Sequence, residues 1–327
     1  MKQVIPVFFT FDHNYVLPAK VAIYSLLCNA SKQYFYELNV LHTQLDGRDM
    51  AGLRSIAGKF DNARIDFIDV SSFDDDASIL HGKKHFSKEI YYKLIAADIF
   101  PDYPKIICSD VDVVFPGDIS ETFFAHDGES YYYAGVGQVF DGDRMDLYES
   151  DFSDAEKDAL KHEISGGYVV FNLDEIRKGN VQRDMQQFYK QNYGRLVYPE
   201  QDCMIMCCWP KIAYLPIKSM VLNSYYALDV AKETFFKYNE GLSAKREDNL
   251  RMFREALAHP VQLHFVGAEK PWNNPFVNKS RVWFGYLVRS GCAFEYICLL
   301  PHIILKKLSN YSLRRFLKKA ARRLKRA

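Results

Sequence analysis

The sequence predicts an α/β fold: a single Rossmann-like domain with a mostly parallel central sheet. Apolar runs of strand length alternate with helical patterns through the first half of the chain. Asp12 and Asp110 stand directly after two of these runs, at the position where open parallel sheets bind ligands. The chain has 327 residues, of which 48% are hydrophobic and 25% charged, and this composition is typical of a soluble globular protein with an ample core.

The elements of the first half are expected in alternating order. Because they are short, continuous apolar runs, four segments predict buried strands: 5–11, 38–42, 65–70 and 105–109. Three segments predict helices: 17–28, 53–60 and 88–100. In the last of these, Ile90, Leu94, Ile95 and Ile99 recur at helical spacing.

The second half of the chain is mixed. Strands are predicted at 131–139 and 168–173, the latter introduced by Gly166-Gly167, and a helix is predicted at 174–192. A short buried helix is expected at 201–208. Because no linker composition occurs before about residue 290, we expect one domain at 1–290 and a tail at 291–327.

The acidic pair Asp110-Val111-Asp112 ends the predicted strand at 105–109. In extended backbone these two carboxylates face the same side, and they repel each other unless a proton or a cation lies between them. A hard divalent cation fits such a pair, with phosphate oxygens completing its coordination shell. The alternative is that the two acids only solvate the end of a strand, which is the commoner case for an isolated D-x-D.

Glycine-rich phosphate loops are missing from the chain. The turn after the first predicted strand reads Phe11-Asp12-His13-Asn14-Tyr15, so neither G-x-G-x-x-G nor a Walker A run is found there. This argues against a dinucleotide-dependent dehydrogenase. If the sheet binds a nucleoside diphosphate, a metal ion on Asp110 and Asp112 can neutralise its charge.

Four further islands carry polar residues beside apolar segments. They are Lys93, upstream of the acidic pair; Ser165-Gly166-Gly167 within 164–172; Glu200-Gln201-Asp202; and 264–272, with His264, Gly267 and Lys270. Taken singly, each has a structural explanation: Glu200 and Asp202 can cap a helix, His264 can be a core histidine, and Lys270 can be a solvated charge.

In order and spacing, the islands resemble glycosyltransferase family 8, the retaining group that includes lipopolysaccharide galactosyltransferases and glycogenin. The resemblance covers about residues 4–275, and the H-x-x-G-x-x-K-P-W island at 264–272 is its most specific part. It implies a GT-A fold for residues 1–290. It also implies a metal-dependent retaining transferase that moves galactose or glucose from a UDP-sugar to a cell-surface glycan or a lipid-linked acceptor.

The resemblance also assigns residue roles. It implies that Mn²⁺ (or Mg²⁺) is held by Asp110, Asp112 and His264, and that Asp12 and Asn14 contact uridine and ribose. Gly267 and Lys270 are implied to contact the diphosphate. The family positions that line the donor sugar match Lys93, Ser165, Gly166, Glu200 and Gln201. Because Gln201 is a poor nucleophile, same-face transfer is favoured over a covalent intermediate, with Lys270 supporting the leaving diphosphate.

Three departures from the family pattern lie at the donor sugar. Lys93 stands where the family has Arg, Ser165-Gly166 where it has Asn-Ala, and Glu200 where it usually has Asp. These changes leave the choice of hexose open. They also keep a second hypothesis, a catalytically weak UDP-sugar-binding or scaffold protein on the same fold.

The C-terminal tail is strongly basic. Residues 306–326 contain ten Lys and Arg and no acid, so the remaining 32 basic residues face 41 acidic ones, a net charge of about −9 for the body. From Leu313 onward, apolar residues recur at helical spacing opposite Arg and Lys, which predicts a basic amphipathic helix that associates with an anionic membrane. A solvated helix or a nucleic-acid-binding arm is the alternative, but the latter leaves the acidic pair unexplained.

The expected location is the cytoplasm, with the tail at the inner face of the cytoplasmic membrane. Seven cysteines without paired spacing favour reduced thiols. The apolar run at 4–11 is followed by Asp12 and reads as a first strand and not as a signal peptide. The longest hydrophobic stretch, 296–305, is too short to span a bilayer.

Overall fold

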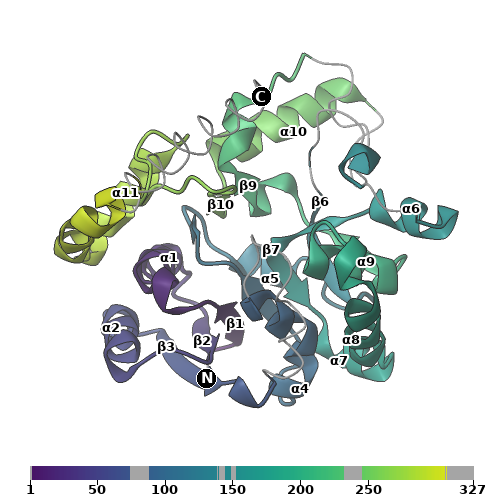
Figure 1. Ribbon diagram of the computed structural model, residues 1–327, viewed down its shortest axis with the longest axis horizontal. Coiled ribbons are helices and arrows are strands. Elements are labelled where there is room, and N and C mark those ends of the chain that lie inside the picture. Colours follow the sequence, from purple (N-terminus) through teal and green to yellow (C-terminus); the bar gives the residue numbers. More distant parts are fainter. Residues whose placement is uncertain are drawn as a thin grey trace, which may run out of the picture.

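A seven-stranded sheet forms the centre of the computed structural model, which describes residues 2–73, 88–137, 139, 144–148, 152–231, 245–305 and 307. The strand order is β3-β2-β1-β4-β7-β6-β8 (Figure 1). The strands are β1 (Val4–Thr10), β2 (Phe35–His42), β3 (Ala63–Asp69), β4 (Ile106–Ser109), β6 (Tyr133–Gly137), β7 (Ile164–Phe171) and β8 (Ile212–Tyr214). Within this sheet β7 runs against the direction shared by the other six. The prediction of a mostly parallel sheet is confirmed.

Helices cover both faces of the sheet. One layer contains α1 (Val16–Asn29), α2 (Gly47–Ala57) and α11 (Ser280–Ser290), and the other contains α7 (Leu173–Lys178), α8 (Val181–Asn192) and α9 (Pro199–Cys208) (Figure 1). The β1 side chains alternate between the two cores: Val7 and Phe9 pack with the first layer and Phe8 with the second. Continuous apolar strands therefore arise because both faces are buried.

A small second sheet brings a distant part of the chain to the acidic pair. It has the order β5-β10-β9, formed by β5 (Val113–Val114), β10 (Leu263–His264) and β9 (Val221–Leu222). β10 runs antiparallel to β5, so that His264 pairs with Val113, the residue after Asp112. The strand register, and not sequence proximity, therefore places His264 beside the D-x-D pair.

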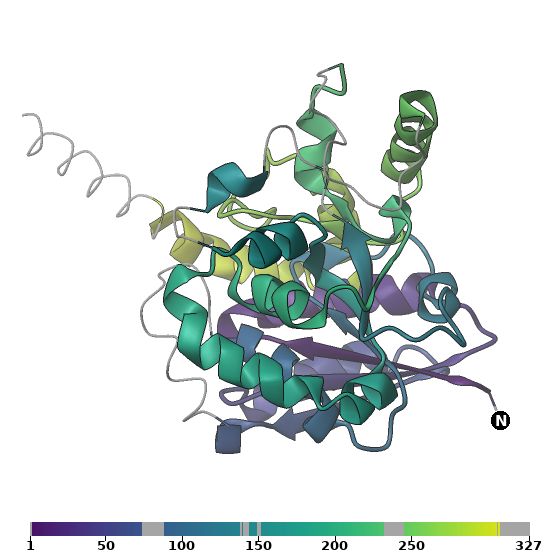
Figure 2. The same ribbon diagram turned by 90° about the vertical axis from the view of Figure 1, so that its right-hand side faces the viewer.

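The remaining elements are short or peripheral. α10 (Arg246–Ala258) lies beyond the small sheet, away from β1 to β3 (Figures 1 and 2). The short helices are α4 (Ala96–Ile99), α5 (Ser120–Phe124), α6 (Asp154–Leu160), η1 (His13–Tyr15), η2 (Ser71–Phe73), η4 (Lys88–Ile95), η5 (Arg144–Leu147), η6 (Tyr193–Arg195), η7 (Ile217–Ser219) and η8 (Asn223–Ala227). Residues 293–305 are also helical.

Several expected elements differ in type or extent. The helix predicted at 174–192 is two helices, α7 and α8, because Gly179 ends the first and Asn180 takes a left-handed conformation with φ 53°. The segment 88–100 is a 3₁₀ helix, η4, followed by the short α4. The strand expected at 168–173 begins at Ile164, so that Gly166 and Gly167 lie inside β7.

The tail predicted to form an amphipathic helix from Leu313 lies outside the described residues. Within the described part of the chain, no helix combines the length and apolarity needed to cross a membrane. All seven cysteines are free thiols, four of them buried.

Candidate metal centre and active site

Asp110, Asp112 and His264 converge where β4, β7 and β10 meet. The Asp110 N–H donates to the Gly167 carbonyl at 3.1 Å, and the Phe265 N–H donates to the Asp112 carbonyl at 2.9 Å. These backbone bonds hold the D-x-D turn between β7 and β10. One ligand atom from each of the three side chains lies within 4.8 Å of the others. The predicted ligand set is thus brought together.

The three side chains fit a divalent cation. His264 Nε2 is 3.0 Å from Asp112 Oδ1 and 3.7 Å from Asp110 Oδ2, so one nitrogen and two carboxylate oxygens face a common point. The other ring nitrogen, Nδ1, is buried and has no hydrogen-bond partner in the described structure. Such a set of two oxygens and one imidazole nitrogen suits a hard or borderline cation that takes further oxygen ligands from phosphate.

Lys270 brings positive charge to the second aspartate. Its ammonium contacts Asp112 Oδ2 and donates to the Phe265 carbonyl at 2.6 Å. Burial would raise the pKa of the Asp112 carboxyl, but His264 and Lys270 outweigh it and hold that pKa well below its usual range. Asp112 is therefore ionised, as a metal ligand must be.

Lys93 holds the first aspartate from the opposite side. Its side chain is buried, 2% exposed, and its ammonium lies 2.7 Å from Asp110 Oδ1 and 3.9 Å from Glu200 Oε1. It also donates to the Gly166 carbonyl at 3.0 Å. Burial alone would lower the pKa of Lys93, but Asp110 and Glu200 outweigh it and raise that pKa above its ordinary value. Lys93 thus links the metal ligands to the residues of α9.

The polar triplet at the start of α9 is buried. A triplet that only capped the helix in solvent would be exposed. Pro199 occupies the first turn, and Glu200, Gln201 and Asp202 are each less than 9% exposed. Gln201 Oε1 accepts from the Gly166 N–H at 2.5 Å, and its Nε2 donates to Glu163 Oε1 at 3.0 Å. Both ends of the amide are therefore committed, which fixes its orientation.

The Glu200 carboxylate has fewer hydrogen-bond partners than the Gln201 amide. Burial raises the pKa of Glu200, and Lys93 opposes that shift. Its Oε2 is buried and has no hydrogen-bond partner in the described structure. A buried acceptor without a partner marks a place where a ligand hydroxyl can donate.

Gly166 and Gly167 leave room for side chains that pack against β7. A Cβ on Gly167 would lie 2.5 Å from two atoms of the His264 ring, and a Cβ on Gly166 would lie 2.9 Å from Gln201 Cγ. The absence of a side chain at these two positions therefore lets His264 and Gln201 reach β7.

The other predicted site residues lie at the same edge of the sheet or next to it. Asp12 follows β1 and accepts from the N–H of Asn14 at 2.9 Å and from its side-chain amide at 3.0 Å. Ser165 is buried in β7 beside Gly166. Gly267 follows β10 with φ 82°, and no heavy atom lies within 4 Å of the Cβ position.

Sequence reasoning missed two buried polar residues of the site. Glu163, 4% exposed, holds Gln201, and its only sequence signal is its position directly before the island at 164–172. Gln262 is fully buried and donates to Ser109 Oγ at 3.0 Å and to the Gly167 carbonyl at 3.2 Å. It ties β4 and β7 to the segment that enters β10, and its position two residues before His264 is the only sequence signal for it.

Comparison with known proteins agrees with this geometry. Residues 6–275 match the family model described as Glycosyl transferase family 8. Over 270 residues the chain is 22% identical to general stress protein A of Bacillus subtilis (strain 168), covering 80% of this chain and 85% of that protein.

Two solved structures share the fold. One is the galactosyltransferase LgtC in complex with donor and acceptor sugar analogs, with a TM-score of 0.64 and 19% identity over 88% of this chain and 96% of that one. The other is the bifunctional glycosyltransferase WbbM, with a TM-score of 0.69 and 19% identity over 91% of this chain. The chain spans about half, 52%, of the WbbM chain.

Proposed function

The chain belongs to glycosyltransferase family 8, and from this premise we propose that it is a metal-dependent retaining hexosyltransferase. It moves galactose or glucose from a UDP-sugar to a cell-surface glycan or a lipid-linked saccharide. The observation that carries the proposal is the convergence of Asp110, Asp112 and His264 on one point, with Lys93 and Lys270 on either side.

The metal ligands and the two lysines have separate tasks in this proposal. Asp110, Asp112 and His264 hold Mn²⁺ (or Mg²⁺), which acts as a Lewis acid on the donor diphosphate when bound. Lys270 leaves Asp112 for the diphosphate and stabilises the charge that grows on it as UDP departs. Lys93, 2.7 Å from Asp110 Oδ1 and 3.9 Å from Glu200 Oε1, holds the Asp110 carboxylate in place and adds positive charge on the donor side of the site.

The rest of the donor binds along the same edge of the sheet. Asp12 and Asn14 contact the uridine and ribose, and Gly267 offers backbone to the diphosphate because its surroundings are open. The orphaned Glu200 Oε2 accepts a hydroxyl of the transferred hexose. Gln201, held by Gly166 and Glu163, lies beside the same sugar, next to Ser165.

Same-face transfer fits these side chains better than a covalent intermediate. An amide is a poor nucleophile, and both ends of Gln201 are engaged. Glu200 carries the carboxylate at the matched donor position, but burial raises its pKa and the Lys93 ammonium lies 3.9 Å from its Oε1. The leaving phosphate then serves as the base for the acceptor hydroxyl on the same face of the sugar.

Release of UDP tests the proposal. Incubation with UDP-galactose or UDP-glucose and Mn²⁺ is expected to release UDP, to do so faster with a suitable acceptor, and to stop when EDTA removes the metal. Undiminished release in EDTA would contradict metal dependence. Donor binding without UDP release from any UDP-hexose would favour the second hypothesis, a UDP-sugar-binding protein that does not catalyse transfer.

Membrane association is proposed for the C-terminal tail, which places the enzyme at the inner face of the cytoplasmic membrane. Glu295 pairs with Lys20 at 2.8 Å, and Tyr296 packs against Trp283 and Phe284, so helix 293–305 is attached to the α1 and α11 layer. This helix still exposes large apolar side chains: Phe294, Ile297, Leu299, Ile304 and Leu305. The basic residues 306–326 follow directly, and the combination suits an anionic lipid surface.

Removing residues 300–327 is expected to release the protein from vesicles that contain anionic lipid. The deletion retains Glu295 and Tyr296 and therefore keeps the contacts that attach the helix to the domain. Co-sedimentation measures the effect, with vesicles of neutral phosphatidylcholine as control. Binding that persists after the deletion would rule the tail out as the anchor.

A further inference from the structure

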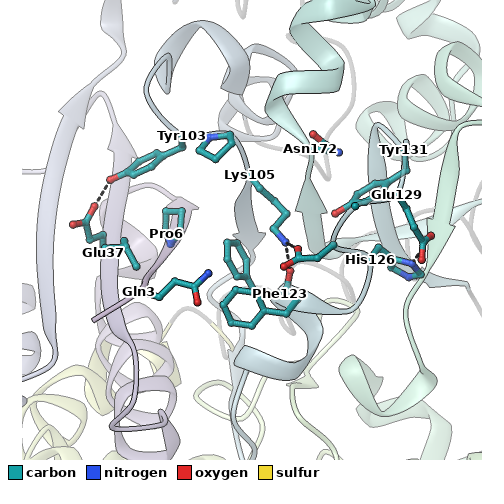
Figure 3. Close-up of a pocket in the computed structure, with 15 residues that line it drawn as sticks. Gln3, Pro6, Glu37, Tyr103, Lys105, Phe123, His126, Glu129, Tyr131 and Asn172 are labelled. Atoms are coloured by element: carbon teal, nitrogen blue, oxygen red, sulfur yellow. Dashed lines mark hydrogen bonds and ion pairs between the residues drawn. The ribbon is translucent and has the colours of Figure 1, made fainter. Parts of the chain in front are cut away.

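A cavity of about 430 Å³ lies at the edge of the sheet opposite Asp12 and Asp110. Figure 3 shows the residues that line it. It is lined by residues at the starts of β1 and β4, among them Gln3 and Lys105, whereas Asp12 and Asp110 follow the ends of the same strands. Asp110 lies five positions after Lys105, which in extended chain is about 17 Å. The volume falls within the range of about 300–1,000 Å³ that is usual for small-molecule sites.

The apolar wall of the cavity is aromatic, and its cation comes from the protein itself. Phe123 and Phe124, at the end of α5, face Lys105, whose ammonium lies 4.2 Å from the Phe123 ring centroid. The same ammonium contacts Asp127 and donates to the Phe123 carbonyl at 2.5 Å. Lys105 therefore occupies the position above these rings where a cationic ligand would otherwise bind.

The other charged groups of the cavity are paired with protein groups. Glu37 accepts from the Tyr103 hydroxyl at 2.6 Å and lies 3.2 Å from Arg64, and Glu129 lies 3.0 Å from His126. The lining holds three carboxylates, those of Glu37, Asp127 and Glu129, and one ammonium, that of Lys105, which contacts only Asp127 among them; with His126 neutral its net charge is −2. This charge disfavours a phosphate or a nucleotide.

Neutral polar groups remain for a ligand. Among the described residues, the Gln3 amide, the Tyr131 hydroxyl and Asn172 Nδ2 have no hydrogen-bond partner. Tyr131 stands at one side of the cavity with its hydroxyl toward the centre, Gln3 lies at the other side, and Asn172 lies above (Figure 3). The Tyr103 and Tyr131 rings, which Lys105 does not cover, add aromatic surface beside these neutral donors and acceptors, a combination that matches the apolar face and the hydroxyls of a sugar ring.

We propose that this cavity, lined by Phe123, Phe124, Gln3, Tyr131 and Asn172, binds a neutral saccharide at a site separate from the catalytic edge. The site does not use the metal or the donor, so it stands independently of the proposed transfer reaction. It provides a second attachment point for a glycan on the face opposite the D-x-D pair.

Two conservative substitutions remove hydrogen-bond donors without disturbing the packing. Tyr131→Phe keeps the ring that packs on His126 and removes only the hydroxyl. Asn172→Asp keeps the Oδ1 that accepts from the Glu175 N–H at 3.2 Å, so the start of α7 is retained while Nδ2 is lost. Each change is expected to weaken saccharide binding about two- to tenfold, and the double variant by their product.

Saturation-transfer difference NMR on the full chain, without UDP-sugar, tests the proposal with glucose, galactose, lactose and maltose as probes. Binding of at least one probe that is reduced in the double variant and retained in Asp112→Asn is the expected result. Equal binding to the double variant and the wild type would place the saccharide elsewhere and overturn the proposal. It would also be overturned if no probe bound up to about 20 mM.

Discussion

Asp112→Asn and Asp110→Asn are each expected to reduce UDP-hexose transfer by about 100-fold or more while the protein stays folded. Asp112 lies between His264 and Lys270, and Asp110 lies between His264 and Lys93. Each carboxylate is therefore next to an ammonium and to an imidazole that can bind a metal. An amide keeps the shape but loses the negative charge that holds a divalent cation. Steady-state UDP release, together with the melting temperature of each variant, measures the effect.

A matched variant separates the local effect from a general change of charge. Asp102 is exposed in the turn before β4, only eight residues from Asp110, and Asp102→Asn is expected to leave transfer unchanged. Full activity in folded Asp110→Asn or Asp112→Asn would contradict the assignment of these residues. Equal loss in Asp102→Asn would mean that the assay reports something other than metal binding.

Lys93→Met is expected to destabilise the folded state by about 3 kcal/mol, because it leaves Asp110 and Glu200 without the ammonium between them. This loss of free energy lies at the lower end of the range for a broken buried ion pair. The reason is that the Asp110 side chain is 30% exposed, so water partly screens its charge. Urea unfolding at constant metal concentration measures the loss. Lys93→Arg, which restores the residue expected from the family, serves as the conservative control.

The loss in Lys93→Met also depends on pH, with a definite sign. Burial already raises the pKa of Glu200, and without Lys93 that pKa rises further. The folded state then binds more protons than the unfolded state, so the stability of the variant falls as pH rises. The difference between wild type and Lys93→Met is therefore expected to shrink from about pH 8 to about pH 5. Adding Glu200→Gln should recover part of the stability, and a double variant no more stable than Lys93→Met would rule out Glu200 as the uncompensated charge.

The sequence predicted the sheet and the acidic pair because both leave local signals. Asp12 and Asp110 follow apolar strands, and the alternation of strands and helices in the first half predicted a parallel sheet whose strand ends share one edge. His264 could be assigned only through the resemblance to a family, since its place beside Asp112 depends on the pairing of β10 with β5, 150 residues apart in the chain.

Other parts of the site could not be predicted because they depend on tertiary packing. Glu163 and Gln262 are polar residues whose burial follows from partners on other elements, Gln201 for one and Ser109 for the other. The reason for Gly167 is the His264 ring, which no local pattern reveals. The break between α7 and α8, by contrast, has a local sequence signal, the turn-forming pair Gly179-Asn180. The prediction of one continuous helix overlooked this pair.

A titration of Mn²⁺ followed by electron paramagnetic resonance, in the presence of UDP, tests the metal assignment most directly. The free ion gives a signal that is lost on binding, so the titration counts bound ions without depending on the sugar or the acceptor. One bound ion per chain is predicted for the wild type, with binding abolished in Asp112→Asn and retained in Asp102→Asn. Tight binding of one ion to folded Asp112→Asn, or no binding to the wild type, would contradict a metal centre formed by Asp110, Asp112 and His264.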